Sequence, residues 1–133
     1  MDKTTTILVV DDNPTIRKGL SVRLRASGYE VLFAEDAISA TAVLLTDRPD
    51  LVILDLGLPA GGGFVVMERL HTNDRVANIP VIVLTGRELE GNRDRALQAG
   101  AVAFFQKPVD DSTLLFAIRK ALDVSRGDLR VDE

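Results

Sequence analysis

The chain has 133 residues, 46% of them hydrophobic and 5% aromatic, which suits one domain with an aliphatic core. The net charge of -4 and the scattered Lys and Arg argue against a nucleic-acid surface, and no apolar stretch reaches the roughly 20 residues of a membrane-spanning helix. The sequence has no cysteine, so disulfides and thiolate metal sites are excluded, and a start unlike a signal peptide favours the cytoplasm.

Short apolar runs alternate with longer amphipathic stretches along the chain. The runs expected to be strands are Ile7–Val10, Val31–Ala34, Leu51–Leu54, Val81–Leu84 and Val102–Phe105. The first, third and fourth are apolar throughout, as expected where helices cover both faces of a sheet. Five strand–helix repeats predict a doubly wound α/β fold with a parallel five-stranded sheet and right-handed crossovers.

The first two stretches between strands have recognisable helix ends. Pro14 suits the first position of a helix capped by Asn13, and Gly28 is a plausible stop. Asp36 can cap the second helix, in which one face is expected to hold Ile38, Ala42 and Leu45. The basic residues, which lie at helical spacings, are expected on solvated faces: Arg17, Lys18, Arg23, Arg25, Arg119 and Lys120.

The later helices are expected from about Phe64 to Leu70, up to Gly100, and along an apolar stripe near the end of the chain. That stripe consists of Leu114, Leu115, Ile118, Ala121 and Leu122. After Val124 the sequence is polar and contains a glycine. We therefore expect one domain over residues 1–124 and a polar tail or the start of a linker over 125–133.

Polar residues follow four of the predicted strands. They are Asp11, Asp12, Asp55, Thr85 and Lys107. In an open parallel sheet the carboxyl ends of the strands meet at one edge, where ligands bind. Each of these residues alone is more often a cap, a turn former or a solvated side chain. Their occurrence together predicts one site.

Three of these side chains are carboxylates, from Asp11, Asp12 and Asp55. Two like charges about 4 Å apart repel by roughly 4 kcal/mol at an effective dielectric near 20, so either a carboxyl takes up a proton or a cation neutralises the group. Oxygen ligands without Cys or His favour a hard divalent ion, and we predict a Mg²⁺ site. A carboxylate can attack phosphorus without the base that Ser needs, and Thr85 and Lys107 would help to neutralise the phosphoryl charge.

Four segments resemble the receiver domain of two-component response regulators, a CheY-like family, and the resemblance runs from about Ile7 to Leu122. The segments are Ile7-Leu8-Val9-Val10-Asp11-Asp12-Asn13, Leu51-Val52-Ile53-Leu54-Asp55-Leu56-Gly57-Leu58-Pro59 with Gly63 further on, Val81-Ile82-Val83-Leu84-Thr85-Gly86, and Lys107-Pro108. The resemblance implies a flavodoxin-like three-layer sandwich with strand order 2-1-3-4-5. It also implies a phosphoacceptor that assists its own phosphoryl transfer and dephosphorylation, rather than an enzyme.

The resemblance further implies roles for individual residues. Asp55 would accept phosphate from a phosphohistidine on a sensor histidine kinase or a histidine phosphotransfer protein. Asp12 and Asp55 would bind Mg²⁺ directly, Asp11 would act largely through water, and the Gly57 backbone carbonyl would supply another ligand. The implied protein is a monomer or a phosphorylation-dependent homodimer.

The switch of such domains is implied to use Thr85 and Phe104, with the face of the fourth helix, fifth strand and fifth helix reorganising on phosphorylation. Lys107 and Thr85 would contact the phosphoryl oxygens. Phe104 lacks a hydroxyl, so packing would have to hold its inward state, and ordinary strand core is an equally good interpretation. The peptide bond between Lys107 and Pro108 is implied to be cis, against a prior of roughly 5 to 6% for any X-Pro bond.

Two features depart from the family pattern. The run Ala60-Gly61-Gly62-Gly63 suggests a mobile loop beside the site. Gly57 and Arg87 occupy positions that modulate phosphorylation lifetime in the family, and their combined effect does not follow from sequence. His71, the only histidine, is expected to be a solvated surface residue.

Three other functions compete with this interpretation. A haloacid dehalogenase-type phosphatase needs Asp-x-Asp after the first strand, where this chain has Asp11-Asp12-Asn13. A flavin-binding protein of the same fold would want a Ser/Thr-rich phosphate loop there. A degenerate receiver that serves only for docking is disfavoured because all five chemical positions are intact.

Overall fold

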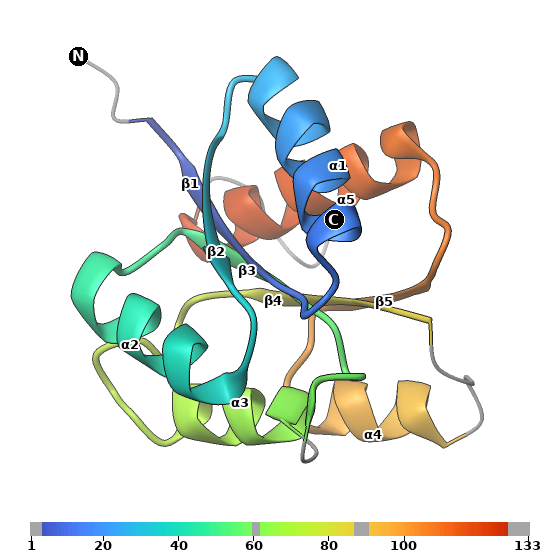
Figure 1. The fold of residues 1–133 in the computed structure, drawn as a ribbon. Coiled ribbons are helices and arrows are strands. Elements are labelled where there is room, and N and C mark those ends of the chain that lie inside the picture. Colours follow the sequence, from blue (N-terminus) through green and yellow to red (C-terminus); the bar gives the residue numbers. More distant parts are fainter. Residues whose placement is uncertain (1–3, 60–61, 87–90, 128–133) are drawn as a thin grey trace.

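Five parallel strands form a single sheet in the computed structural model, which describes residues 4–59, 62–86 and 91–127. The strands are β1 (Thr6–Val10), β2 (Glu30–Ala34), β3 (Leu51–Leu54), β4 (Val81–Thr85) and β5 (Ala103–Gln106). Their order is β2-β1-β3-β4-β5, and every neighbouring pair is parallel (Figure 1). The predicted flavodoxin-like fold and its strand order are confirmed.

Five helices cover the two faces of this sheet. They are α1 (Pro14–Ala26), α2 (Ala37–Asp47), α3 (Gly62–His71), α4 (Asn92–Gln98) and α5 (Asp111–Ser125). Figure 1 shows α1 and α5 on one side of the sheet and α2, α3 and α4 on the other. None of the helices in the described part of the chain is long and apolar enough to span a bilayer.

Two hydrophobic clusters fill the space between the layers. Alternate residues of β1 point to opposite faces, so Ile7 and Val9 join the cluster beneath α1 and α5, while Leu8 and Val10 join the cluster that contains side chains of α2, α3 and α4. β1, β3 and β4 are almost entirely buried because both of their faces are covered. The carboxyl ends of these strands are therefore held in a closely packed framework.

The predicted ends of the first two helices are confirmed. The Asn13 side chain accepts hydrogen bonds from the backbone N–H groups of Thr15 and Ile16, and Gly28 follows α1 with a φ of +95°. Asp36 caps α2 by accepting a hydrogen bond from the Ser39 backbone N–H, and the Ser39 hydroxyl oxygen accepts one from the Asp36 backbone N–H.

The predicted face of α2 packs only in part, because Leu45 is partly buried against the hydrophobic cluster but Ile38 and Ala42 are exposed. Ala40 and Leu44 are buried against the sheet, whereas Ile38 is 77% exposed and Ala42 also faces solvent. α2 is apolar on most of its sides, so periodicity alone does not single out the stripe that packs.

Several element bounds also differ from those expected. β5 is shifted one residue later than predicted, and Val102 precedes it with 54% exposure. α4 ends at Gln98, two residues before Gly100, which has a φ of +109°. The α5 stripe is confirmed, but the helix continues through Ser125, the first residue of the expected tail.

α3 begins at Gly62, two residues before the predicted start, so Gly62 and Gly63 are buried helix residues rather than loop residues. A Cβ on Gly63 would lie 2.7 Å from the Leu56 Cα and 2.9 Å from the Asp55 carbonyl oxygen. Glycine at this position therefore lets α3 touch the backbone that follows β3. Ala60 and Gly61, the rest of the expected mobile loop, lie outside the described residues.

Candidate functional site

Strand register brings the predicted polar residues to one edge of the sheet. Val10 pairs with Leu54, so Asp11 and Asp55 both follow directly at the ends of neighbouring strands. On the other side of β3, Thr85 is the last residue of β4, and it pairs with Gln106, the residue before Lys107. Residues separated by up to 96 positions in the sequence thus form one hydrogen-bonded group.

Asp55 lies at the centre of this group and is only 8% exposed. Its Oδ1 accepts hydrogen bonds from the Thr85 hydroxyl at 2.8 Å and from the Gly57 backbone N–H at 2.9 Å. Its Oδ2 lies 3.5 Å from the Lys107 ammonium nitrogen. The backbone N–H of Asp55 donates to the Val10 carbonyl, so the sheet fixes the backbone from which this carboxylate projects.

Asp11 is held by hydrogen bonds through both its side chain and its backbone. Its Oδ2 lies 2.7 Å from the Lys107 ammonium nitrogen, and its Oδ1 accepts the Asn13 backbone N–H at 2.9 Å. Its own backbone N–H donates to the Ala34 carbonyl, and its carbonyl oxygen accepts a hydrogen bond of 2.7 Å from the Arg17 guanidinium. Both the side chain and the backbone of Asp11 are therefore held by partners from several elements.

Asp12 completes the acidic cluster and, unlike its neighbours, is exposed. One carboxylate oxygen each from Asp11, Asp12 and Asp55 can be chosen so that all lie within 4.8 Å of one another. Lys107 supplies one positive charge to these carboxylates, which leaves an excess of two negative charges among the four side chains. This set of oxygen donors fits a hard divalent cation such as Mg²⁺, which keeps several waters where few carboxylates bind it.

The other residues singled out in the sequence are Gly57, Phe104, Pro108 and Arg87. Gly57 sits two residues beyond Asp55, where an added Cβ would lie 3.4 Å from the Asp55 Oδ1. Phe104 is 6% exposed and packs in the cluster beneath α2, α3 and α4. The Lys107–Pro108 peptide bond is cis. Arg87 lies outside the described residues.

Sequence reasoning missed the role of Arg17 at this site. It was expected on a solvated face, but it is only partly exposed and its guanidinium bonds to the Asp11 carbonyl. No local pattern links residues six positions apart across a strand end, a turn and the first turn of a helix. His71 is exposed at the end of α3, as expected, and contributes no contact to the acidic cluster.

Comparison with known proteins agrees with this geometry. The family model of the response regulator receiver domain matches residues 7–119. The chain is 37% identical over 117 residues to the phosphate regulon transcriptional regulatory protein PhoB of Pseudomonas aeruginosa, covering 88% of this chain and 51% of that protein. It is 34% identical to Protein PilH of the same species, covering 87% of this chain and 96% of PilH. The chain thus spans about half of PhoB but nearly all of PilH.

Solved structures with the same fold include two informative neighbours. A CheY-like response regulator receiver domain protein from Methanospirillum hungatei has a TM-score of 0.87 and 30% identity, with 96% of this chain and 100% of that chain covered. The receiver domain of the sensor histidine kinase PA1611 from Pseudomonas aeruginosa, with a magnesium ion coordinated in its active-site cleft, has a TM-score of 0.82 and 28% identity, covering 90% and 98%. This chain belongs to the response regulator receiver domain family.

Proposed function

We propose that this domain is the phosphoacceptor of a two-component His–Asp phosphorelay, with Asp55 as the residue that is phosphorylated. The observation that carries the proposal is the arrangement around its carboxylate. Thr85 and Lys107 both contact Asp55, and two further acids lie beside it. Family membership and the similarity to PhoB and PilH support the same signalling role.

The chemistry follows from the position of each group. An Asp55 carboxylate oxygen attacks the phosphorus of a phosphohistidine, a P–O bond forms, and the P–N bond breaks to release the imidazole. Lys107 and the Thr85 hydroxyl, which both contact the Asp55 carboxylate, would donate to the phosphoryl oxygens once those oxygens are attached to Asp55. Such transfer depends mainly on positioning and charge neutralisation, and no general base is needed.

Magnesium is the cofactor we propose, held by Asp11, Asp12, Asp55 and the Gly57 backbone carbonyl. The support is the oxygen-donor cluster with its excess negative charge, together with the magnesium-bound PA1611 receiver domain. When bound, the ion would neutralise negative charge on the acids and on the phosphoryl group. As the family resemblance implies, Asp12 and Asp55 would bind the ion directly and Asp11 mainly through water, while Asp11 also accepts hydrogen bonds from Lys107 and the Asn13 N–H.

The proposed donor is a sensor histidine kinase or a histidine phosphotransfer protein in the cytoplasm. The chain would act as a signalling module that assists its own phosphorylation and dephosphorylation, not as an enzyme with a separate substrate. We expected the receiver domain at residues 1–124, and because α5 continues through Ser125 we propose that the domain includes that residue too. Some relatives are much longer than the segment matched here, which covers 51% of PhoB and 27% of the response regulator PleD of Caulobacter vibrioides.

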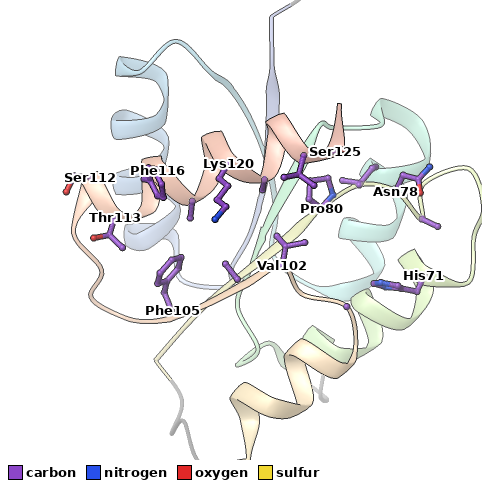
Figure 2. Close-up of a pocket in the computed structure, with 17 residues that line it drawn as sticks. His71, Asn78, Pro80, Val102, Phe105, Ser112, Thr113, Phe116, Lys120 and Ser125 are labelled. Carbon is purple, nitrogen blue, oxygen red and sulfur yellow. The ribbon is translucent and has the colours of Figure 1, made fainter. Parts of the chain in front are cut away.

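We further propose that phosphorylation changes the face formed by α4, β5 and α5, through Thr85 and Phe104. This face carries a groove of about 900 Å³ between β5 and α5. Figure 2 shows Phe105 of β5 and Phe116 of α5 on its walls, and Phe116 is 69% exposed. An exposed apolar surface of this kind can bind a partner protein, so a change in the shape of this face would change what it binds.

Phosphorylation can be tested with acetyl phosphate and Mg²⁺, followed by intact-protein mass spectrometry. We expect an acid-stable, base-labile phosphoryl mass gain that is absent from Asp55→Asn and from protein treated with EDTA. Asp50→Asn is a matched control, because Asp50 instead bonds the Thr6 backbone N–H at the start of β1. A mass gain that persists in Asp55→Asn would refute the assignment.

The proposed switch can be tested separately with beryllofluoride, which mimics an acyl phosphate. We expect backbone amide shifts in α4, β5 and α5 to change on addition of beryllofluoride and Mg²⁺, with smaller changes in α2. Identical spectra for α4, β5 and α5 with and without the reagent would contradict the proposed switch but not the phosphoacceptor role.

A further inference from the structure

Among the basic side chains of α1, Arg17 is the one that hydrogen-bonds to the segment between β1 and α1, which contains Asp11 and Asp12. It lies near the start of the helix, where its backbone N–H donates to the Asn13 carbonyl, and its Nη1 reaches back to the Asp11 carbonyl at 2.7 Å. Its neighbour Lys18 is exposed, whereas Arg17 is partly buried. Arg17 is therefore not simply a solvated surface charge, because its guanidinium is partly buried and hydrogen-bonds to the protein backbone.

The carbonyl that Arg17 holds belongs to the peptide plane that joins Asp11 to Asp12. Because that unit is rigid, fixing its oxygen restricts the direction in which the chain enters Asp12. On the far side of Asp12, the Asn13 backbone N–H donates to the Asp11 Oδ1. Asp12, the exposed member of the acidic cluster, is thus bracketed by two hydrogen bonds that fix the backbone before and after it.

We propose that Arg17 is a positioning residue for the divalent-cation site, holding the turn between β1 and α1 so that Asp12 points at Asp11 and Asp55. This inference rests on the proposed function, since it concerns the same site. The planar guanidinium is suited to the task because it directs its N–H donors in a fixed fork and keeps its charge at every working pH. Arg17 touches neither phosphoryl group nor metal; it acts through the peptide bond.

The charge of Arg17 allows positioning to be separated from simple electrostatics. The guanidinium, which is held at the Asp11 backbone carbonyl, repels a cation that enters the acidic cluster, so removing that charge alone would tighten Mg²⁺ binding. Loss of positioning has the opposite effect, because Asp12 no longer converges with the other acids. The sign of the change in Mg²⁺ affinity therefore identifies which role dominates.

The test compares Arg17→Met with the wild type and with Lys18→Met, which removes an exposed charge from the same turn. Mg²⁺ is titrated into each protein and the dissociation constant is read from the backbone amide shifts of Asp12 and Asn13. We expect Arg17→Met to raise the Kd about tenfold or more, as for other partners that orient metal ligands, and Lys18→Met to stay within about twofold. Binding by Arg17→Met that is as tight as, or tighter than, that of the wild type would overturn the inference.

A second readout does not depend on metal. Without Mg²⁺, the amides of residues 11–13 should exchange with solvent faster in Arg17→Met, while those of β3 stay unchanged. Arg17→Lys keeps the positive charge but lacks the planar guanidinium, so both its Mg²⁺ affinity and its amide exchange should fall between those of the wild type and Arg17→Met. This variant replaces Arg17→Met in the test if the methionine variant does not fold. Unchanged exchange at residues 11–13 in both variants would also overturn the inference. A wild type that binds no Mg²⁺ would instead contradict the proposed function.

Discussion

The centre of the sheet and its β5 edge differ sharply in how firmly they are packed. All residues of β3 and β4 are buried, and β1 is buried from Ile7 to Val10. At the edge, only Phe104 of β5 is buried, and α4 is a short helix with Ala96 as its one buried residue. The proposed nucleophile thus follows a fully buried strand, whereas two of the elements of the proposed switch, α4 and β5, have few buried residues.

This difference has a physical use in a signalling domain. Phosphoryl transfer requires the carboxylate, the ammonium and the hydroxyl to be positioned within a fraction of an ångström, which buried strands can provide. A change of state requires a segment that can move at modest free-energy cost, and such segments have few buried contacts. Thr85 connects the two regions, because it ends a fully buried strand and pairs with β5.

The largest expected loss of stability comes from substituting a core residue beside the site. Leu54 is fully buried and directly precedes Asp55, so Leu54→Ala should lower the free energy of unfolding by about 2–5 kcal/mol. Leu97→Ala in α4 should cost about 0.5 kcal/mol or less, because that side chain is 38% exposed. Urea unfolding measures both variants. Equal losses would mean that α4 is as firmly packed as β3.

A smaller loss is expected at the contact between α3 and the loop after β3. Gly63→Ala should destabilise the domain by about 1–3 kcal/mol, since its Cβ would overlap the backbone of Asp55 and Leu56. Gly19 is the matched control, because it lies in α1 with nothing within 4 Å of an added Cβ. Gly19→Ala should stabilise by about 0.5–1 kcal/mol. Thermal unfolding measures the stability of both variants. An unchanged stability of Gly63→Ala would show that the backbone of Asp55 and Leu56 moves to accommodate the methyl group.

The contact between α4 and α3 should have a still smaller effect on stability. The Arg95 guanidinium carbon lies 3.8 Å from the centroid of the Phe64 ring, and Arg95 is exposed. Arg95→Gln should cost about 0.5–1 kcal/mol. Hydrogen exchange in α4 should become faster while β1 and β3 keep their protection, and Arg93→Gln in the same helix should have no such effect. Unchanged exchange in α4 would show that this pair does not anchor the helix.

The smallest expected effect is a pH dependence at the start of α5. Hydrogen bonds from the Ser112 hydroxyl and from the hydroxyl and N–H of Thr113 lower the pKa of Asp110 to about 2, from an ordinary value of 3.8. Because the folded-state pKa is the lower one, the stabilising contribution is fully present above about pH 4 and is lost as the pH falls towards about 2.

Asp110→Asn removes this titration. The difference in unfolding free energy between wild type and Asp110→Asn, measured by urea unfolding, should therefore shrink as the pH is lowered through that window. A difference that stays constant from about pH 5 to about pH 2 would rule out Asp110 as its source.

Much of this architecture follows from local sequence signals. The strands are short apolar runs, and Asn13 and Asp36 cap helices through side-chain hydrogen bonds that act within a few residues. The site residues are recognisable because they follow buried strands, and parallel strands bring their carboxyl ends together. These features depend on periodicity and near neighbours, so the sequence alone predicts them.

Contacts between distant elements were decided only in the folded chain. The sequence does not show that Arg17 reaches the Asp11 carbonyl, that Gly63 lies against the Asp55 backbone, or that Ile38 faces solvent. Each of these depends on how closely two separate elements approach and on which side of a helix meets the sheet. The sequence by itself determined the elements, the family and the chemical groups of the site, whereas tertiary packing decided which atoms those groups contact.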